Sequence, residues 1–270
     1  MANFIVIFFS FGAGLLLRHS RTRFPAQSAR ALNAFVIHLS YPALILAQFP
    51  LLLKNTPIDT KLLLPVSMAW IQFALSWITF SFLGKKFGWS RATIGALILT
   101  AGLGNTSFVG FPLLEALLGL EAVGVGIIVD QPGSFLVLST IGIITAAAFA
   151  GASLDPRSIA KRVFTFPPFL ALLLSIVWWA TGLVGYDQLK TPFERISTTL
   201  VPLALFAVGL QMGFNAEVLR AKGRKLFAGL SFKLVAVPVF FFGFYMFLLG
   251  QRDFVAHVTV LESAMAPMIT

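Results

Sequence analysis

Charged residues are scarce in this sequence, and cysteine is absent altogether. Of its 270 residues, 11% are charged and 58% are hydrophobic, whereas a soluble domain carries about 25% charged residues. Because so few charges cannot cover a water-facing surface, we predict an integral membrane protein. The lack of cysteine excludes disulfides, thiolate metal sites and cysteine nucleophiles. The three histidines (His19, His38 and His257) lie too far apart in the sequence to form a metal-ligand motif.

The sequence also lacks the short motifs of ATP-driven pumps and of metalloproteases. It contains no G-x-x-x-x-G-K-[ST] phosphate-binding loop and no H-E-x-x-H zinc motif. We therefore predict that the protein is not an enzyme, uses no cofactor and is not a primary pump by itself.

Apolar runs long enough to cross a bilayer recur along the whole chain. A spanning helix needs about 20 mostly apolar residues. The sequence predicts nine such segments, at 2–18, 31–53, 61–83, 92–119, 122–150, 166–185, 196–214, 226–250 and from 254 onward. No polar stop follows the ninth segment before Thr270, so we expect the natural chain to continue into a tenth helix.

Lysine and arginine concentrate in alternate loops of this arrangement. The loops after the first, third, fifth and seventh segments carry most of them: Arg18, Arg21, Arg23, Arg30, Lys85, Lys86, Arg91, Arg157, Lys161, Arg162, Arg220, Lys222, Arg224 and Lys225. The other loops carry only Lys54, Lys61, Lys190, Arg195 and Arg252. Basic loops stay in the cytoplasm, so we predict a multi-pass protein of the cytoplasmic membrane with its N-terminus outside. The net charge of +10 then reflects these loops and not a nucleic-acid partner.

Two pairs of prolines suggest an internal repeat. Pro42 and Pro202 lie in the second and seventh segments, and Pro112 and Pro267 lie in the fourth and ninth. A repeat of five helices places its second copy upside down in the membrane, as in many secondary transporters. The predicted fold is therefore all-α, with two inverted five-helix units. The first unit would span 1–150, a short cytoplasmic linker 151–165, and the second unit 166–270, incomplete at its C-terminus.

The fourth segment contains the signals of a broken helix. Three glycines and a proline fall within 101–112, namely Gly102, Gly104, Gly110 and Pro112. A break inside a membrane is tolerated against protein or a wet cavity, and it leaves free N–H groups on one half-helix and free carbonyls on the other. Asn105, Thr106 and Ser107 add neutral hydrogen-bonding groups, so a carboxylate is a suitable ligand. The alternative is a packing kink built from small residues.

Ionisable residues within the apolar segments are the remaining candidates, because such groups are costly in a membrane. Glu262 precedes Pro267 and could bind sodium or carry a proton. Asp130, with Gln131 beside it, lies near the middle of the fifth segment. Lys233 and Gln211 are candidates for supporting roles. The alternatives are a structural partner for each acid, and snorkelling of Lys233 to the membrane surface.

Four stretches together resemble the auxin efflux carrier family: Asn105–Leu113, Asp130–Gln131, Lys233 with Pro238, and Glu262–Met268. Bacterial members of this family are often described as malate or malonate permeases, and its plant relatives are the PIN-formed auxin exporters. The resemblance implies ten helices in two inverted repeats, similar to the bile acid sodium symporter fold. Helices 1, 2, 6 and 7 would form a scaffold, with a homodimer through helices 2 and 7. Helices 3 to 5 and 8 to 10 would form a mobile transport domain.

The resemblance also implies roles for individual residues. Broken helices 4 and 9 would cross at Pro112 and Pro267, Asn105 would bind the substrate carboxylate, and Glu262 would match a cation-coordinating acid. The full set of predicted substrate residues is Asn105, Thr106, Ser107, Gly110, Pro112 and Pro267. The predicted ion-coupling residues are Glu262, Asp130 and Gln131, with sodium at Glu262 as one alternative and a proton as the other.

The function predicted from these features is secondary active transport of small organic anions, such as dicarboxylates or auxin-like carboxylates, by alternating access. The expected partners are the anion and the lipid bilayer. Two alternatives stay open at this point, a passive anion channel and a truncated, inactive membrane protein.

Overall fold

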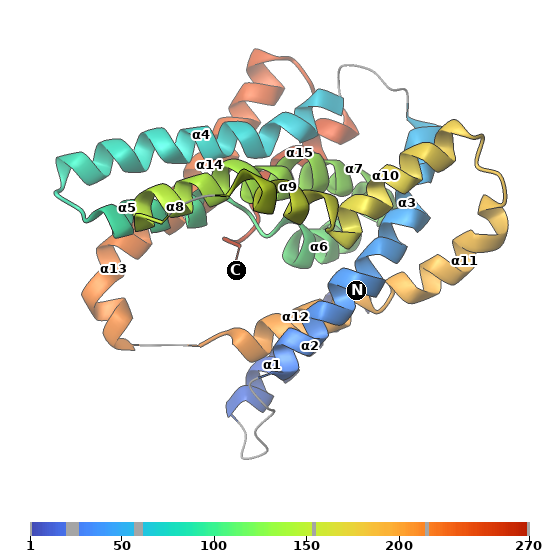
Figure 1. Ribbon diagram of the computed structural model, residues 1–270, viewed down its shortest axis with the longest axis horizontal. Helices are drawn as coiled ribbons and strands as arrows, with labels where there is room; N and C mark the ends of the chain where they lie inside the picture. Colours follow the sequence, from blue (N-terminus) through green and yellow to red (C-terminus); the bar gives the residue numbers. More distant parts are fainter. Residues whose placement is uncertain (1, 20–26, 57–61, 153–154, 214–215, 269–270) are drawn as a thin grey trace. The chain divides into compact units, whose positions relative to one another are not determined.

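The computed structural model describes residues 2–19, 27–56, 62–152, 155–213 and 216–268 (Figure 1). Over these ranges the chain is helical, and the β-type pairing there is a single isolated bridge. The all-α prediction is confirmed. Arg21, Arg23 and Lys61, which contributed to the predicted orientation, lie outside the described residues, as does the end of the ninth segment.

Every apolar segment predicted from the sequence corresponds to a helix or to a broken helix. Within the described ranges, five helices are long and apolar enough to cross a membrane: Ser28–Asn55, Leu63–Lys86, Leu120–Ala150, Tyr186–Gln211 and Lys222–Leu248. A sixth span is a pair bent by 59°, Pro156–Phe164 with Pro167–Ala180. The shorter apolar helices are Asn3–Arg18, Arg91–Gly102, Thr106–Leu118 and Phe254–Ser263. The protein is therefore a multi-pass membrane protein.

Two stretches predicted as loops are helical instead. The predicted linker contains α9 (Pro156–Phe164), and α11 (Tyr186–Ser197) precedes the predicted start of the seventh segment. Both helices are polar on one face, so neither forms a continuous apolar run in the sequence. Asp155 begins α9, because its Oδ1 accepts a hydrogen bond from the Arg157 backbone N–H at 3.0 Å.

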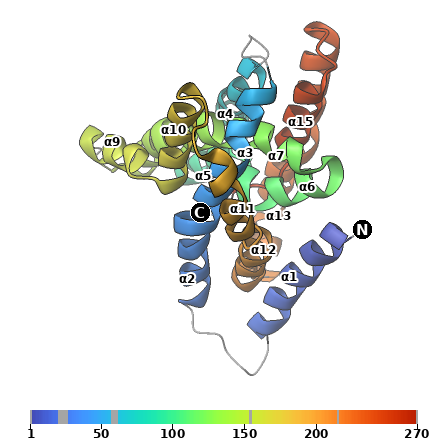
Figure 2. The same ribbon diagram turned by 90° about the vertical axis from the view of Figure 1, so that its right-hand side faces the viewer.

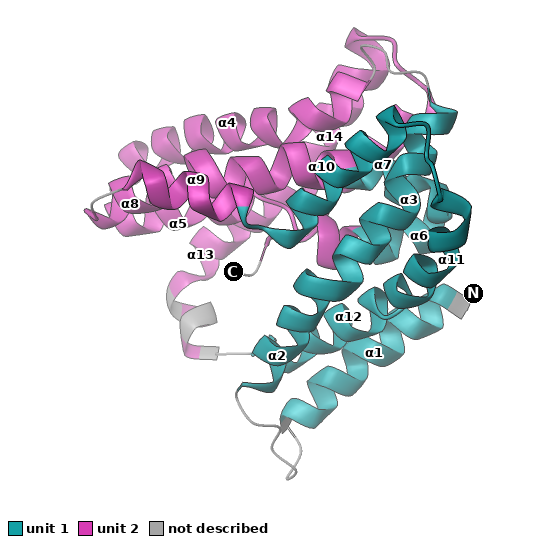
Figure 3. Ribbon diagram, turned by 45° about the vertical axis from the view of Figure 1, so that its right-hand side comes forward, with its two compact units in different colours: residues 1–58, 111–127, 165–214 teal, residues 59–110, 128–164, 215–270 magenta. Residues whose placement is uncertain are grey.

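The chain divides into two compact units, coloured separately in Figure 3. Unit 1 comprises residues 1–58, 111–127 and 165–214, and unit 2 comprises residues 59–110, 128–164 and 215–270. Each unit thus combines segments from both predicted repeats. Unit 1 contains the four helices that the resemblance assigns to a scaffold, together with residues 111–127. The inverted repeat itself, with boundaries 1–150 and 166–270, stays a prediction.

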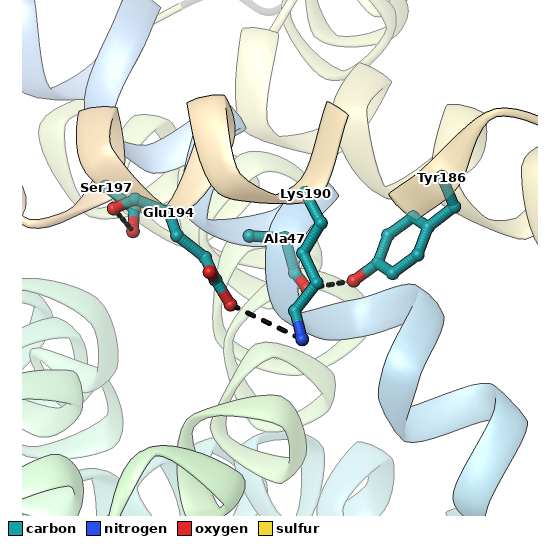
Figure 4. Close-up of polar contacts among 5 residues, drawn as sticks. All are labelled: Ala47, Tyr186, Lys190, Glu194 and Ser197. Atoms are coloured by element: carbon teal, nitrogen blue, oxygen red, sulfur yellow. Dashed lines mark hydrogen bonds and ion pairs between the residues drawn. The ribbon is translucent and has the colours of Figure 1, made fainter. Parts of the chain in front are cut away.

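Helix α3 is central to one part of unit 1. Helices α10 and α11 both pack against α3 (Figure 2). The Tyr186 hydroxyl at the start of α11 donates a hydrogen bond of 2.5 Å to the Ala47 carbonyl of α3 (Figure 4). Further along α11, Lys190 and Glu194 form an ion pair at 3.7 Å. The elements of unit 1 are α1 (Ala2–His19), α2 (Ser28–Phe35), η1 (Val36–Ser40), α3 (Tyr41–Asn55), α6 (Phe111–Leu118), α10 (Pro167–Ala180), α11 and α12 (Leu200–Gln211), and α7 (Leu120–Ile128) begins in it.

Helices α1 and α12 of unit 1 lie side by side in close backbone contact (Figure 1). A Cβ atom added to Gly209 would collide with the Phe11 carbonyl oxygen and would lie 3.1 Å from the Gly14 Cα. A Cβ added to Gly14 would collide with the Phe206 carbonyl oxygen. Glycine is therefore required on both helices at this crossing, as is common between membrane helices.

The substitution Gly209→Ala is expected to lower stability, because backbone atoms cannot rotate away from the new methyl group. We expect a loss of about 1–3 kcal/mol, as for other overpacked sites. Thermal melting of the purified protein in detergent measures it. Gly12→Ala is the matched control on α1, because its Cβ would meet no heavy atom within 4 Å. Equal melting temperatures for the two variants would contradict the close contact.

Unit 2 is built around the long helix α4 (Leu63–Lys86), which packs against α5 (Arg91–Gly102), η4 (Val129–Phe135) and α15 (Phe254–Ser263). Buried aromatic residues fill this packing, and the Phe80 and Phe232 rings meet edge to face at 5.2 Å. The other elements of unit 2 are η3 (Thr106–Gly110), η5 (Leu138–Gly142), α8 (Ile143–Ala150), α9, α13 (Ala216–Ser231), η6 (Phe232–Ala236), α14 (Val237–Phe242) and η7 (Gly243–Leu248).

Candidate functional site

The break after α5 and the stretch that follows α15 pair through their backbones inside unit 2. Helix α5 ends at Gly102 and η3 begins at Thr106, while α15 ends at Ser263. The Asn105 N–H donates to the Ala266 carbonyl at 2.8 Å, and the Met268 N–H donates to the Leu103 carbonyl at 3.2 Å. These bonds form an antiparallel bridge between Gly104 and Pro267. The predicted break of the fourth segment is thus present, and its backbone groups pair with the stretch that follows α15 within the apolar region.

The resemblance implied a crossing at Pro112, but the structure places the crossing at Gly104. Pro112 lies in α6, within the helix Thr106–Leu118, and belongs to unit 1. The physical reason is close approach, because a Cβ added to Gly104 would lie 3.0 Å from the Lys233 Nζ. A residue with a side chain would crowd that ammonium group, whereas glycine leaves room for it. Pro267 does lie at the crossing, as predicted.

Asn105 begins the second half of the broken helix. Its Oδ1 accepts a hydrogen bond from the Phe108 backbone N–H at 3.0 Å, and its side chain is buried. This is the geometry of a helix N-cap. With the amide oxygen used in this way, the amide N–H₂ is the part of Asn105 that can donate to a ligand. Ser107 follows in the first turn and is also buried.

Asp130 holds the two π-helical segments η3 and η4 together. The Thr106 hydroxyl donates to its Oδ1 at 2.5 Å, and the Gln131 Nε2 donates to its Oδ2 at 2.7 Å. All three side chains are buried. The predicted substrate residue Thr106 and the predicted ion-coupling pair are therefore neighbours, and both carboxylate oxygens of Asp130 already accept hydrogen bonds.

Lys233 points into the protein rather than toward the membrane surface. Its side chain has no exposed surface, and its Nζ donates to the Ser263 carbonyl at 2.9 Å and to the Gln72 Oε1 at 3.2 Å. The snorkelling alternative is therefore wrong. Gln72 in turn donates from Nε2 to the Ala101 carbonyl at 3.4 Å. Lys233 thereby contacts the end of α15 directly and is linked to the end of α5 through Gln72.

Glu262 is the least satisfied ionisable group of the site. It is completely buried, and neither carboxylate oxygen has a hydrogen-bond partner. A Cβ added to Gly110 would lie 2.6 Å from each of these oxygens. Asp130 and Lys233 are the charged groups that act on it electrostatically. A buried carboxyl group without donors is costly, which is typical of a group that exchanges a ligand or a proton.

Unit 2 thus brings together most of the predicted site residues: Asn105, Thr106, Ser107, Gly110, Pro267, Glu262, Asp130, Gln131 and Lys233. Pro112 and Gln211 belong to unit 1. The Gln211 Nε2 donates to the Ala207 carbonyl of its own helix at 3.1 Å. Pro112 lines a cavity of about 590 Å³ in unit 1, together with Gln48, Glu115 and Glu194.

Sequence reasoning missed the roles of Gln72, Gly104 and the Ser263 carbonyl. The sequence marks Gln72 only as a polar residue within the apolar segment 61–83. The described part of the chain holds no group of three or more His, Cys, Asp and Glu side chains that could bind a metal ion.

Comparison with known proteins agrees with this architecture. The chain is similar to an uncharacterized transporter of Methanothermobacter thermautotrophicus, with 27% identity over 245 residues that cover 88% of this chain and 76% of that protein. It is also similar to an uncharacterized transporter of Methanocaldococcus jannaschii, with 28% identity over 194 residues, covering 70% and 62% of the two chains. Residues 1–270 match the family described as membrane transport protein. This match over the whole chain shows that the protein belongs to this family of auxin efflux carrier-like membrane transporters.

Proposed function

We propose that the protein is a secondary carrier that moves a small organic anion across the cytoplasmic membrane by alternating access. The observation that carries this proposal is the pairing of a broken helix with the end of α15, beside a buried lysine and a buried glutamate whose oxygens accept no hydrogen bond, in unit 2. Paired half-helices with ionisable side chains at the break are the usual ion and substrate sites of secondary transporters. The substrate would be a dicarboxylate or an auxin-like carboxylate.

The anion would bind at the N-terminal end of the helix Thr106–Leu118. Backbone N–H groups at a helix N-terminus attract negative charge. The Asn105 amide and the Ser107 hydroxyl add neutral donors there, while the neighbouring Thr106 hydroxyl already donates to Asp130. Gly110 and Pro267 complete the proposed substrate residues of unit 2. A neutral site of this kind can bind and release a carboxylate without separating a strong ion pair.

Coupling to an ion gradient would run through Glu262. Its two oxygens have no donors, so this group is available to a proton or to a sodium ion, whereas both oxygens of Asp130 accept hydrogen bonds. Binding of the ion at Glu262 would then influence Thr106 through Asp130, which accepts hydrogen bonds from both Gln131 and Thr106. We further propose unit 2 as the moving transport domain and unit 1 as the scaffold, dimeric through α3 and α12.

Substitution of Asn105 tests the substrate site. Asn105→Ala is expected to abolish saturable uptake of labelled malate or malonate into proteoliposomes. Because this change also removes an N-cap, with an expected cost of about 1 kcal/mol, Asn105→Asp is the sharper variant. Aspartate retains the oxygen that caps Phe108 and replaces the amide donor with a negative charge, so uptake should be lost while melting is preserved. Asn55→Ala, at the end of α3, is the control.

Normal uptake by a folded Asn105→Asp variant would contradict the assigned substrate site. Trans-stimulated exchange is the second readout of the same experiment. A carrier saturates and exchanges external for internal anion, whereas a channel passes current without exchange. If the unmodified protein passes current without exchange, it is an anion channel and the carrier proposal is wrong.

A further inference from the structure

The carbonyl ends of two half-helices meet at the crossing in unit 2. The last carbonyls of a helix lack intrahelical partners and carry partial negative charge. In transporters with discontinuous helices, such ends coordinate the coupling cation. Here they are the last turns of α5 and α15, represented by the carbonyls of Ala101 and Ser263.

A side chain of the protein already occupies this position. The Lys233 ammonium group donates to the Ser263 carbonyl at 2.9 Å and to the Gln72 Oε1 at 3.2 Å. Gln72 extends the contact to the Ala101 carbonyl at 3.4 Å. Glycine at position 104 leaves room for the ammonium, because an added Cβ would lie 3.0 Å from Nζ and 3.5 Å from Cε. The lysine is fully buried, and both of these acceptors are neutral oxygens of the protein.

We propose that Lys233 is a resident cation that fills the cation position of the crossing, so that the coupling ion is a proton carried by Glu262 and not sodium. This inference rests on the proposed function of the protein as a coupled carrier. A sodium ion at the crossing would compete with the ammonium for the same oxygens and would lie beside a like charge. Two cations so close together in a buried site repel each other strongly.

The surrounding charges favour a proton at Glu262. The charged groups acting on it are Lys233 from η6 and Asp130 from η4. Of the elements packed against α15, α14 carries no charged residue, η7 contributes the titratable Tyr245, and the charged residues of α4 are Lys85 and Lys86 in its last turn. With a proton on Glu262, Lys233 and Asp130 balance each other. Without it, the three groups carry one net negative charge.

Sodium-dependent melting of the purified full chain tests the inference without requiring transport. Melting temperatures are compared in sodium chloride and choline chloride at equal ionic strength. The unmodified protein should show no sodium-specific rise. Lys233→Ala leaves the carbonyl and amide oxygens open, so sodium should now raise the melting temperature by about 3 °C. Lys233→Arg retains a cation and should not respond to sodium.

Two melting results would overturn the inference. One is a sodium-specific rise in the unmodified protein that Glu262→Gln removes. The other is a folded Lys233→Ala variant that does not respond to sodium. If Lys233→Ala does not fold, uptake by the unmodified protein decides. Accumulation driven by a pH gradient and unchanged by replacing sodium with choline supports the inference, and accumulation driven by sodium overturns it. Absence of uptake under both gradients, by contrast, contradicts the carrier function. The melting experiment still shows whether Lys233 excludes sodium from the crossing.

Discussion

Glu262→Gln is expected to abolish accumulation driven by an ion gradient while preserving exchange of anion for anion. Glutamine has nearly the same shape as glutamate and fits the same buried position, but it can neither carry a proton nor bind a cation as a carboxylate does. A carrier whose coupling group has a fixed charge can still alternate between its two orientations with the anion bound, and so exchange anion for anion. It can no longer use the energy of the ion gradient.

The size of the effect follows from the energy of the gradient. A tenfold gradient of one coupled ion is worth about 1.4 kcal/mol, which supports about tenfold accumulation of an anion when one ion is coupled to each. In Glu262→Gln the accumulation ratio should fall to about one, while trans-stimulated exchange continues at a measurable rate. Uptake of labelled malate or malonate into proteoliposomes, under imposed proton and sodium gradients in turn, measures both quantities.

Glu121→Gln is the matched control for this experiment. Glu121 is exposed in the first turn of α7, so its charge should not matter for coupling. Unchanged gradient dependence in Glu262→Gln would transfer the coupling role to Asp130 or to another group. Loss of both accumulation and exchange in a folded variant would give Glu262 a part in binding the anion itself.

The helices and their breaks could be predicted from sequence because the physical causes are local. Apolar length sets the spans, and the cluster of glycines between 101 and 112 interrupts the fourth one. The polar helices α9 and α11 were missed because their periodicity lies in residues that also suit loops. Helix α11 also contains Pro192, a residue that disfavours a helix interior.

The partners of the site residues could not be predicted, because they depend on contacts between distant segments. Lys233 in an apolar helix is compatible with snorkelling or with burial, and only the contact with Ser263 and Gln72 decides between them. The sequence likewise marks both Gly104 and Pro112 as breaking residues. The pairing of Gly104 with Pro267, far away in the chain, determines which of them forms the crossing.

Gly110→Ala is the second substitution for which we expect a large effect. The new methyl group would lie 2.6 Å from both carboxylate oxygens of Glu262, well inside the contact distance of about 3.5–4.0 Å between non-bonded heavy atoms. Because the obstacle is the end of a side chain, the carboxyl group can move and the fold should survive. We expect a stability loss within the range of about 1–3 kcal/mol for overpacking, but a fall in the accumulation ratio from about ten to about one.

Three further variants separate displacement of Glu262 from general damage. Gly243→Ala, also helical and in unit 2, meets no heavy atom within 4 Å and should behave as the unmodified protein does. In a Glu262→Ala background the space beside position 110 is open, so adding Gly110→Ala should cause no further loss of exchange or stability. Such non-additivity is the signature of two residues in contact. If Gly110→Ala instead lowers exchange equally with and without the Glu262 side chain, Gly110 acts on the anion and not on the coupling group.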